Sequence, residues 1–332
     1  MSQMENRRKV IIDLDAGTDD AWALLILLRG EQRFGYEVIA ITCVHGNTNV
    51  DDVTVNVLRV LTAIGRTDIP VFKGAREPFI TSPVPRTSYF HGVNGFGDIA
   101  FEQQIDLGLL KPGHAAPELY RLLAAHGGRV ALIFVGPLTN LALCIKLHPE
   151  VLELLGADGL YVMGGNRHGV GNATRSAEFN FYADPEAAHI VFQRVPPTCP
   201  ITVLPWETCL TQAPALPMAW RLDVLGGGPN VNEAVRMLNV IERKLYGDRP
   251  NWMPCDAFLV AAFVDPSIVE RSEWFHVEIE LHGAITRGQM VLDHLKARNT
   301  AKPENGEPKE NVRIIDRIND ESFRQLCQMA AL

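Results

Sequence analysis

The 332-residue sequence lacks a long hydrophobic run and is short of positive charge. Its apolar runs are far shorter than the roughly 20 residues that a membrane-spanning helix requires, so we expect no membrane partner. Lys and Arg number 31 against 39 Asp and Glu, which gives a net charge of −8. This balance argues against nucleic acid or an anionic lipid surface as the main partner, and we expect neither.

Cysteine is scarce and scattered. The six residues, none of them in a CxxC pair, are Cys43, Cys144, Cys199, Cys209, Cys255 and Cys327. This spacing argues against a disulfide framework or a zinc site and favours reduced thiols. The polar start MSQMENRRK leads directly into the first apolar segment, so we expect no signal peptide and a soluble, cytoplasmic protein.

What the sequence does contain is a dense group of carboxylates near its start, in the stretch KVIIDLDAGTDDAWA (residues 9–23). The apolar run before the acids predicts a buried strand, and AWALLILL after them predicts a buried helix. The acids between them are Asp13, Asp15, Asp19 and Asp20. We expect Gly17 to give the turn a backbone conformation that other residues avoid, and Thr18 or Asp19 to cap the helix.

Four carboxylates this close repel one another, and at least one pKa should rise unless a cation neutralises them. Oxygen ligands suit a hard ion such as calcium or magnesium, which would lower the pKa of a bound water so that a neighbouring carboxylate could take its proton. An acidic helix cap needs only one or two acids. An EF-hand loop counted from Asp13 fails, because its sixth and twelfth positions hold Thr18 and Leu24. A phosphatase with the DxDx[TV] pattern would need Thr or Val where Gly17 stands.

The rest of the chain alternates strands with helices, in a composition that is 47% hydrophobic and 21% charged. Further strands are expected at 36–42, 69–74, 130–136, 159–165, 200–206 and 311–318, with a hairpin from 275–283 and 288–294. Helices are expected up to Gly30, at 53–64, 117–126, 139–147, 184–193, 230–246 and 253–264, and from Asp320. We therefore predict an α/β fold with an open, mostly parallel, Rossmann-like sheet covered by helices on both faces, in one domain of residues 1–332.

Polar motifs follow five of the predicted strands directly: DLDAGTDD, VHGNTN, VGPLTN, MGGNRHGVGN and LPWE. Ligands bind such sheets outside the carboxyl ends of the strands, so these segments should meet at one edge. Residues 75–112 form a long, Pro- and Gly-rich candidate functional loop, and residues 296–312 are expected to be a mobile excursion.

The chain resembles the inosine–uridine-preferring nucleoside hydrolase family, whose N-terminal signature is DxDxGxDD. The matching segments, in collinear order, are DLDAGTDD (13–20), GN (46–47), HGVNGFG (91–97), GPLTN (136–140), MGG (163–165), GN (171–172), AEFNFYADPEAA (177–188) and CD (255–256). Each motif alone is weak, but eight in order over most of the chain make a specific match.

The resemblance implies a nucleoside hydrolase fold and a Ca²⁺-dependent reaction that cleaves the C1′–N bond of a ribonucleoside to free base and ribose. It implies that Asp15, Asp20, Asp256 and the carbonyl of Val135 bind the calcium ion, with Asp15 also the base that deprotonates the attacking water. Asp13 would order the turn. Asp19 and Asn47 would hold ribose hydroxyls, Asn172, Glu178 and Asn180 would bind the rest of the sugar, and Met163 would lie against its ring. A homodimer or homotetramer is also implied.

The residue types suit this chemistry, because positive charge builds on the ribose as the glycosidic bond breaks. A site of amides and carboxylates should reject sugars without a 2′-OH, whose loss leaves buried polar groups unpaired. Asn47, Asn140 and Asn172 also flank turn glycines, where Asn is common without any binding role. Asp256 precedes a wholly apolar helix, and a carboxylate buried there needs a partner or a metal.

The sequence departs from the family pattern at Cys255, where well-known members have a histidine that protonates the leaving base or a tryptophan that stacks on it. A neutral thiol, with an ordinary pKa of about 8.5, is a poor acid near pH 7, although Cys255 stays a candidate catalytic residue. The chain could therefore instead be a nucleoside- or ribose-binding protein of the same fold.

His91 is the candidate for contact with the base, against the alternative of a structural hydrogen bond. Tyr89, Phe90, Trp206 and Trp252 are candidates for stacking on the base. The sequence assigns no role to Glu207 and does not choose between purine and pyrimidine.

Overall fold

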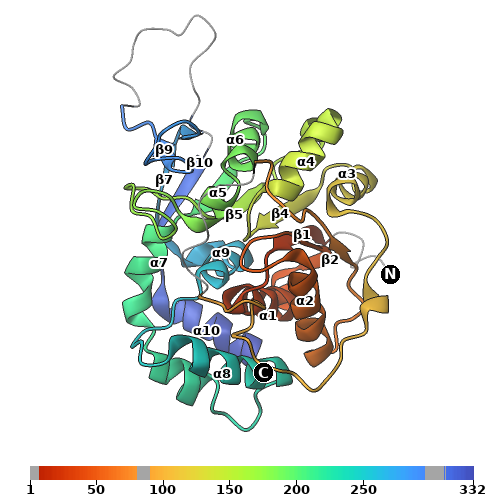
Figure 1. Cartoon of the computed structure of the whole chain (residues 1–332), viewed down its shortest axis with the longest axis vertical. Coiled ribbons are helices and arrows are strands. Elements are labelled where there is room, and N and C mark those ends of the chain that lie inside the picture. The colour runs from red at the N-terminus through yellow and green to blue at the C-terminus, as the bar shows by residue number, and fades with distance from the viewer. Residues whose placement is uncertain (1–6, 81–89, 296–309, 311) are drawn as a thin grey trace, which may run out of the picture.

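An eight-stranded sheet forms the centre of the computed structural model, which describes residues 7–80, 90–295, 310 and 312–332 (Figure 1). In sheet order the strands are β3 (Val71–Lys73), β2 (Tyr36–Cys43), β1 (Arg8–Leu14), β4 (Val130–Phe134), β5 (Leu160–Met163), β6 (Ile201–Leu204), β10 (Val312–Ile318) and β7 (Val269–Phe275). All neighbours pair in parallel except β10 and β7, which are antiparallel. The predicted α/β class is confirmed.

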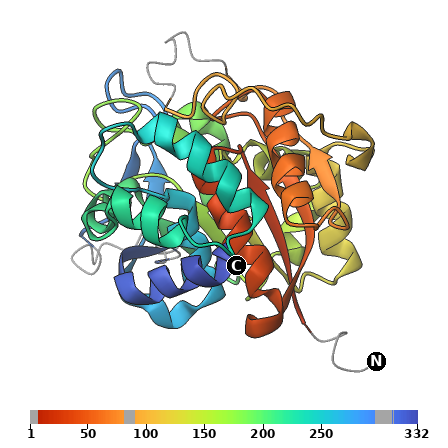
Figure 2. The same ribbon diagram turned by 90° about the horizontal axis from the view of Figure 1, so that it is seen from below.

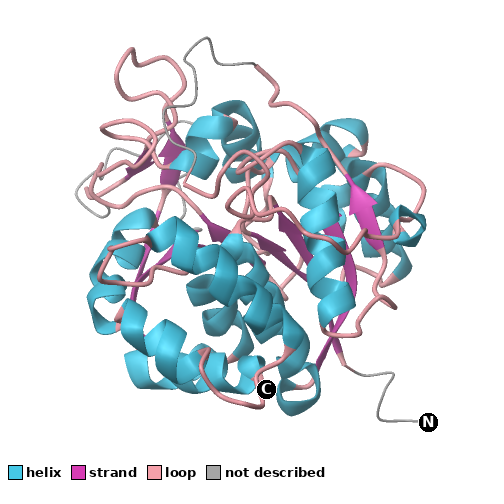
Figure 3. Cartoon of the chain, turned by 60° about the horizontal axis from the view of Figure 1, so that its bottom comes forward, coloured by secondary structure: helices cyan, strands magenta, loops and turns pink. Residues whose placement is uncertain are grey.

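Helices cover both faces of the sheet (Figure 3). One face carries α1 (Thr18–Phe34), α2 (Val50–Ala63), α8 (Glu233–Tyr246), α9 (Cys255–Val264) and α10 (Asp320–Ala331), and the other carries α3 (Ala115–Ala125), α4 (Thr139–Leu147) and α6 (Pro185–Arg194). Strand β1 feeds both cores, because Val10 and Ile12 pack on the first face and Ile11 on the second. The C-terminal helix α10 packs against α1 (Figure 2).

Several elements differ from the sequence-based expectation. The first helix runs past Gly30 and ends at Gly35, whose φ of 75° is the left-handed conformation typical of a helix end. Strand β6 stops at Leu204, and Trp206 begins the short helix α7 (Trp206–Gln212). Strand β7 was not expected, because as an edge strand it is largely exposed and its sequence VERSEWF has no apolar face.

The predicted hairpin is present as β8 (Val277–Ile279) and β9 (Met290–Leu292), which pair antiparallel outside the main sheet. Most of the predicted excursion at 296–312 lies outside the described residues. Within the described ranges, the helices are all too short or too polar to span a membrane.

Candidate active site

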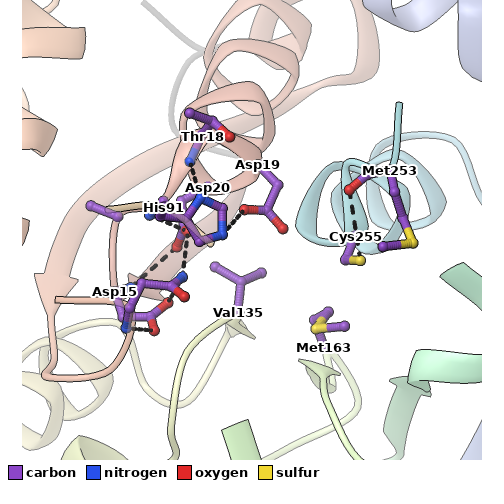
Figure 4. Close-up of polar contacts among 12 residues, drawn as sticks. Asp15, Thr18, Asp19, Asp20, His91, Val135, Met163, Met253 and Cys255 are labelled. Carbon is purple, nitrogen blue, oxygen red and sulfur yellow. Dashed lines mark hydrogen bonds and ion pairs between the residues drawn. The ribbon is translucent and has the colours of Figure 1, made fainter. Parts of the chain in front are cut away.

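A cavity of about 480 Å³ opens at the carboxyl ends of the central parallel strands. The predicted site residues that line it are Asp19, Asn47, His91, Val135, Met163, Asn172, Glu178, Asn180, Cys255 and Asp256. Asp15 and Asp20 lie behind the wall and are fully buried. Figure 4 shows Asp19 and Cys255 facing each other across this space, with Val135 and Met163 between them on one side.

Three carboxylates converge at one end of the cavity. Asp19 and Asp20 lie in the first turn of α1 and Asp256 in the first turn of α9, and one oxygen from each lies within 4.8 Å of the others. Burial, then the charge of Asp19, raises the pKa of Asp20 to about 7, although N–H groups of Gly17 (2.6 Å) and Asp15 (3.1 Å) donate to it. Burial and the nearby acids raise the pKa of Asp256 well above its usual range. A cation would relieve both effects.

Asp15 lies beside this cluster but faces Asn47. The backbone N–H of Asn47 donates to Oδ2 of Asp15 at 2.5 Å, and Nδ2 of Asn47 lies 3.2 Å from Oδ1. The backbone N–H of Asp15 is in turn the donor to Asp20. A side chain at Gly46 would collide with the Asp15 carboxylate, which explains why a glycine precedes Asn47 here.

Asp13 and Asn140 form a buried support beneath the turn. Asp13 accepts hydrogen bonds from Thr42 Oγ1 (2.5 Å) and Asn140 Nδ2 (2.7 Å). Asn140 also donates to the carbonyl of Cys43 (3.0 Å) and accepts from the N–H of Ala75 (2.8 Å). Asn140 therefore joins β1, β2 and the segment after β3, and burial raises the pKa of Asp13 to about 7.

Asn180 and Glu178 form the wall on the β5 side. Nδ2 of Asn180 donates to the carbonyls of Val135 (2.8 Å) and Met163 (3.1 Å). Glu178 accepts from the N–H groups of Asn180 and Gly165, both at 2.8 Å, and burial raises its pKa to about 7. Asn172 is exposed at the edge of the cavity.

His91 lies at the N-terminus of α1. Its Nδ1 accepts a hydrogen bond from the N–H of Thr18 (3.3 Å), and its Nε2 lies 3.5 Å from Oδ1 of Asp19. The capping expectation is wrong: Gly17, not Thr18 or Asp19, is the N-cap, because the His91 ring takes the role of acceptor. The expected backbone role of Gly17 is also wrong, since its φ of −80° and ψ of −170° are extended; the left-handed residue in this turn is Ala16.

Comparison with known proteins identifies the family. A sequence profile described as "Inosine-uridine preferring nucleoside hydrolase" matches residues 10–325. The chain belongs to this family. It is 34% identical over 298 residues to the inosine-uridine preferring nucleoside hydrolase of Leishmania major (86% of this chain, 88% of the relative). It is 31% identical to the enzyme of the same name from Crithidia fasciculata (88% and 89% covered).

Solved structures agree with this assignment. An inosine-guanosine nucleoside hydrolase superposes with a TM-score of 0.85 at 30% identity, covering 98% of both chains. A plant nucleoside hydrolase superposes with a TM-score of 0.83 at 25% identity, and the match covers 98% of this chain and 100% of the plant chain. The protein is thus an enzyme, a nucleoside hydrolase, and its family reaction is hydrolysis of the N-glycosidic bond of ribonucleosides.

The aromatic wall of this nucleoside hydrolase differs from the expected set. Phe90 and Trp206 line the cavity. Trp252 does not: it is fully buried against Trp22, and its Nε1 donates to Glu242 at 3.0 Å. Tyr89 lies outside the described residues.

Sequence reasoning missed Tyr246 and Arg249, which line the cavity at and beyond the end of α8. The Tyr246 ring packs edge-on against Phe90 with centroids 5.3 Å apart, and the Arg249 guanidinium lies 4.8 Å from the same ring centroid. The only signal in the sequence was a tyrosine at the end of an amphipathic helix.

The thiol of Cys255 is held as a neutral donor. Its Sγ lies 3.8 Å from the carbonyl of Met253. A hydrogen bond with the Cys209 thiol, together with burial, raises the pKa of Cys255 well above its usual range. The nucleoside hydrolase thus presents an uncharged, weakly acidic group at this point of the cavity wall.

Proposed function

We propose that the protein is a calcium-dependent hydrolase that attacks C1′ of a ribonucleoside with water and releases free base and ribose. The observation that carries the metal proposal is the convergence of Asp19, Asp20 and Asp256 at one end of the cavity. Asp20 and Asp256 are buried and Asp19 is half-buried, so three carboxylates this close are costly when ionised, and an all-oxygen donor set fits a hard divalent cation. We propose Asp15, Asp20, Asp256 and the Val135 carbonyl as its ligands.

The carbonyl of Val135 is able to accept a further partner. The Val135 carbonyl already accepts from Asn180, but a carbonyl oxygen has two lone pairs and can serve both partners. A divalent cation held there would supply positive charge that favours ionisation of a nearby water and attracts sugar hydroxyl oxygens.

The side chains have separate roles in this proposal. Asp15 accepts the proton of the attacking water at a carboxylate oxygen, and the N–H of Asn47 fixes the orientation of that carboxylate. Asp19 and Asn47 bind the vicinal hydroxyls of the ribose.

The rest of the substrate is bound by the other residues of the cavity wall. Asn172, Glu178 and Asn180 bind the remainder of the sugar, and Met163 lies against the ring. His91, Phe90, Trp206 and Tyr246 surround the base.

The test is to incubate the purified protein with inosine, uridine and 4-nitrophenyl riboside, with and without a chelator. We expect release of ribose that chelation abolishes, that calcium restores and that magnesium restores less well. Full activity in chelator would overturn the metal proposal. Tight nucleoside binding without release of ribose would favour a binding protein. Turnover of 4-nitrophenyl phosphate would favour a phosphatase.

We also propose that the protein is a cytoplasmic homodimer or homotetramer of one-domain chains. Light scattering tests the proposed assembly.

A further inference from the structure

Glu207, the second residue of α7, accepts hydrogen bonds from three backbone N–H groups of the loop between β5 and α5 (Phe179–Ala183). Oε2 accepts from Arg167 at 2.8 Å, and Oε1 accepts from His168 at 2.9 Å and Val170 at 3.1 Å. In Figure 1 this loop lies beside the start of α7. Hydrogen bonds to a charged acceptor are about twice as strong as neutral ones, so this carboxylate is a main attachment of the loop, beside the ion pairs of Arg167 with Asp316 and Glu273.

The part of the loop that Glu207 fixes leads directly into the wall of the cavity. Asn172, Ala173 and Thr174 line that wall. From Gly171 onwards the loop is compact, since the N–H groups of residues 172–174 all lie 3.2 to 3.3 Å from the carbonyl of Ala177. This compact turn is attached at its start, where Glu207 binds, and at its end, where Ser176 Oγ donates to the carbonyl of Ile285 at 2.8 Å and Asn166 Nδ2 donates to the carbonyl of Ser176 at 2.6 Å.

Glu207 also joins two walls of the cavity. Its neighbour Trp206 lines the cavity, and the N–H of Trp206 donates to the carbonyl of Gly165 at 3.0 Å. The carboxylate of Glu207 therefore ties the loop that carries Asn172 to the helix start that carries Trp206. Glu207 does not line the cavity.

We propose that Glu207 is a positioning residue for substrate recognition, which places Asn172 against the 5′-hydroxyl of the ribosyl group. This inference rests on the proposed function. A ribosyl group has hydroxyls at 2′, 3′ and 5′, and Asp19 and Asn47 are proposed to bind the vicinal pair. The 5′-hydroxyl remains for the wall formed by Asn172, Glu178 and Asn180, and Asn172 is the residue of this wall that the loop held by Glu207 carries.

The decisive experiment compares inosine with 5′-deoxyinosine in the parent and in Glu207→Gln. The amide keeps one acceptor oxygen but turns an NH₂ group toward a backbone N–H, so the loop loses part of its attachment. We expect KM for inosine to rise at least tenfold with kcat within threefold, and KM for 5′-deoxyinosine to change less than twofold. A merely structural role would raise both KM values together, and that result, or no change in either, would overturn the proposal.

Asp265→Asn is the matched control. Asp265 also accepts a backbone N–H, from Ser267 at 3.1 Å, but it follows the far end of α9 and lines no part of the cavity. In this variant the KM values for inosine and 5′-deoxyinosine should both stay within twofold of those of the parent. If Glu207→Gln does not fold, Glu207→Asp keeps the charge with a shorter reach and should show the same selective loss in weaker form.

Hydrogen exchange separates failure of this inference from failure of the proposed function. The amides of Arg167, His168 and Val170 should exchange at least tenfold faster in Glu207→Gln than in the parent, whether or not the parent hydrolyses nucleosides. If the parent is inactive, calorimetric titration with ribose and 5-deoxyribose replaces kinetics. A preference for ribose that Glu207→Gln retains in full would overturn the positioning role.

Discussion

The imidazole of His91 lies directly against Gly17. A Cβ atom added at Gly17 would come within 2.7 Å of Cε1 and 2.8 Å of Nδ1 of the His91 ring, closer than real Cβ contacts allow. The same ring accepts the N–H of Thr18 and approaches Asp19. The place of His91 at the start of α1 therefore requires that residue 17 have no side chain.

Gly17→Ala should displace the His91 ring without removing it. We expect turnover of inosine to fall more than tenfold, as we also expect for His91→Ala, and the double variant to be little worse than either single one, because both act through the same ring. Gly228→Ala is the control, since a Cβ there meets its nearest neighbour, Val231, only at 3.7 Å. Unchanged turnover in His91→Ala would remove His91 from the mechanism.

Local patterns predicted the sheet and its polar edge well, because alternation of strands and helices forces parallel strands whose carboxyl ends coincide. Contacts between segments that are distant in the sequence could not be predicted from these local patterns. Gly17 was explained by backbone freedom, whereas the reason is a ring that arrives from residue 91. Trp206 and Trp252 looked alike in sequence, and only packing places one in the cavity and the other in the core. The meeting of Asp256 with Asp20 was expected from family resemblance alone.

Asp15→Asn should nearly abolish hydrolysis. The amide keeps the shape of the side chain but cannot take a proton from water, and its NH₂ group opposes one of the donors from Asn47. We expect kcat to fall at least about 100-fold, the scale of lost general-base catalysis, and calcium affinity measured by calorimetry to weaken as well. Asp52→Asn, at a half-buried carboxylate in the first turn of α2 that does not line the cavity, is the control. Activity near that of the parent would show that the base lies elsewhere.

Asp256→Asn should separate metal binding from folding. In chelator, burial and the charges of Asp19, Asp20 and Asp15 all oppose ionisation of Asp256, so removing its charge relieves repulsion. We expect the chelated variant to unfold at a higher temperature than the chelated parent at pH 8. Added calcium should raise the Tm of the parent but not that of the variant. Equal stabilisation of both proteins by calcium would exclude Asp256 as a ligand.

His45 should make stability depend on pH. Its Nε2 lies 3.0 Å from Oγ1 of Thr139, which donates to Asp184 at 2.7 Å, and burial lowers the pKa of His45 to about 4. The unfolded chain, with an ordinary His pKa near 6.5, binds this proton first as pH falls. The contribution of neutral His45 is therefore complete above pH 6.5 and is lost as pH falls toward 4, by roughly 2 kcal/mol at pH 5.

Urea unfolding of the parent and His45→Gln at pH 7 and pH 5, both in chelator, measures this contribution. The raised pKa values of Asp13, Asp20 and Glu178, each about 7, act in the opposite direction, because their folded forms bind protons that the unfolded chain has released. Those groups are present in both proteins, so their effects on the free energy of unfolding cancel when the parent is compared with His45→Gln. We expect the parent to lose roughly 2 kcal/mol more than His45→Gln between the two pH values, and His282→Gln, at an exposed position, to follow the parent. Parallel losses in parent and His45→Gln would show that His45 protonates in the folded protein without cost.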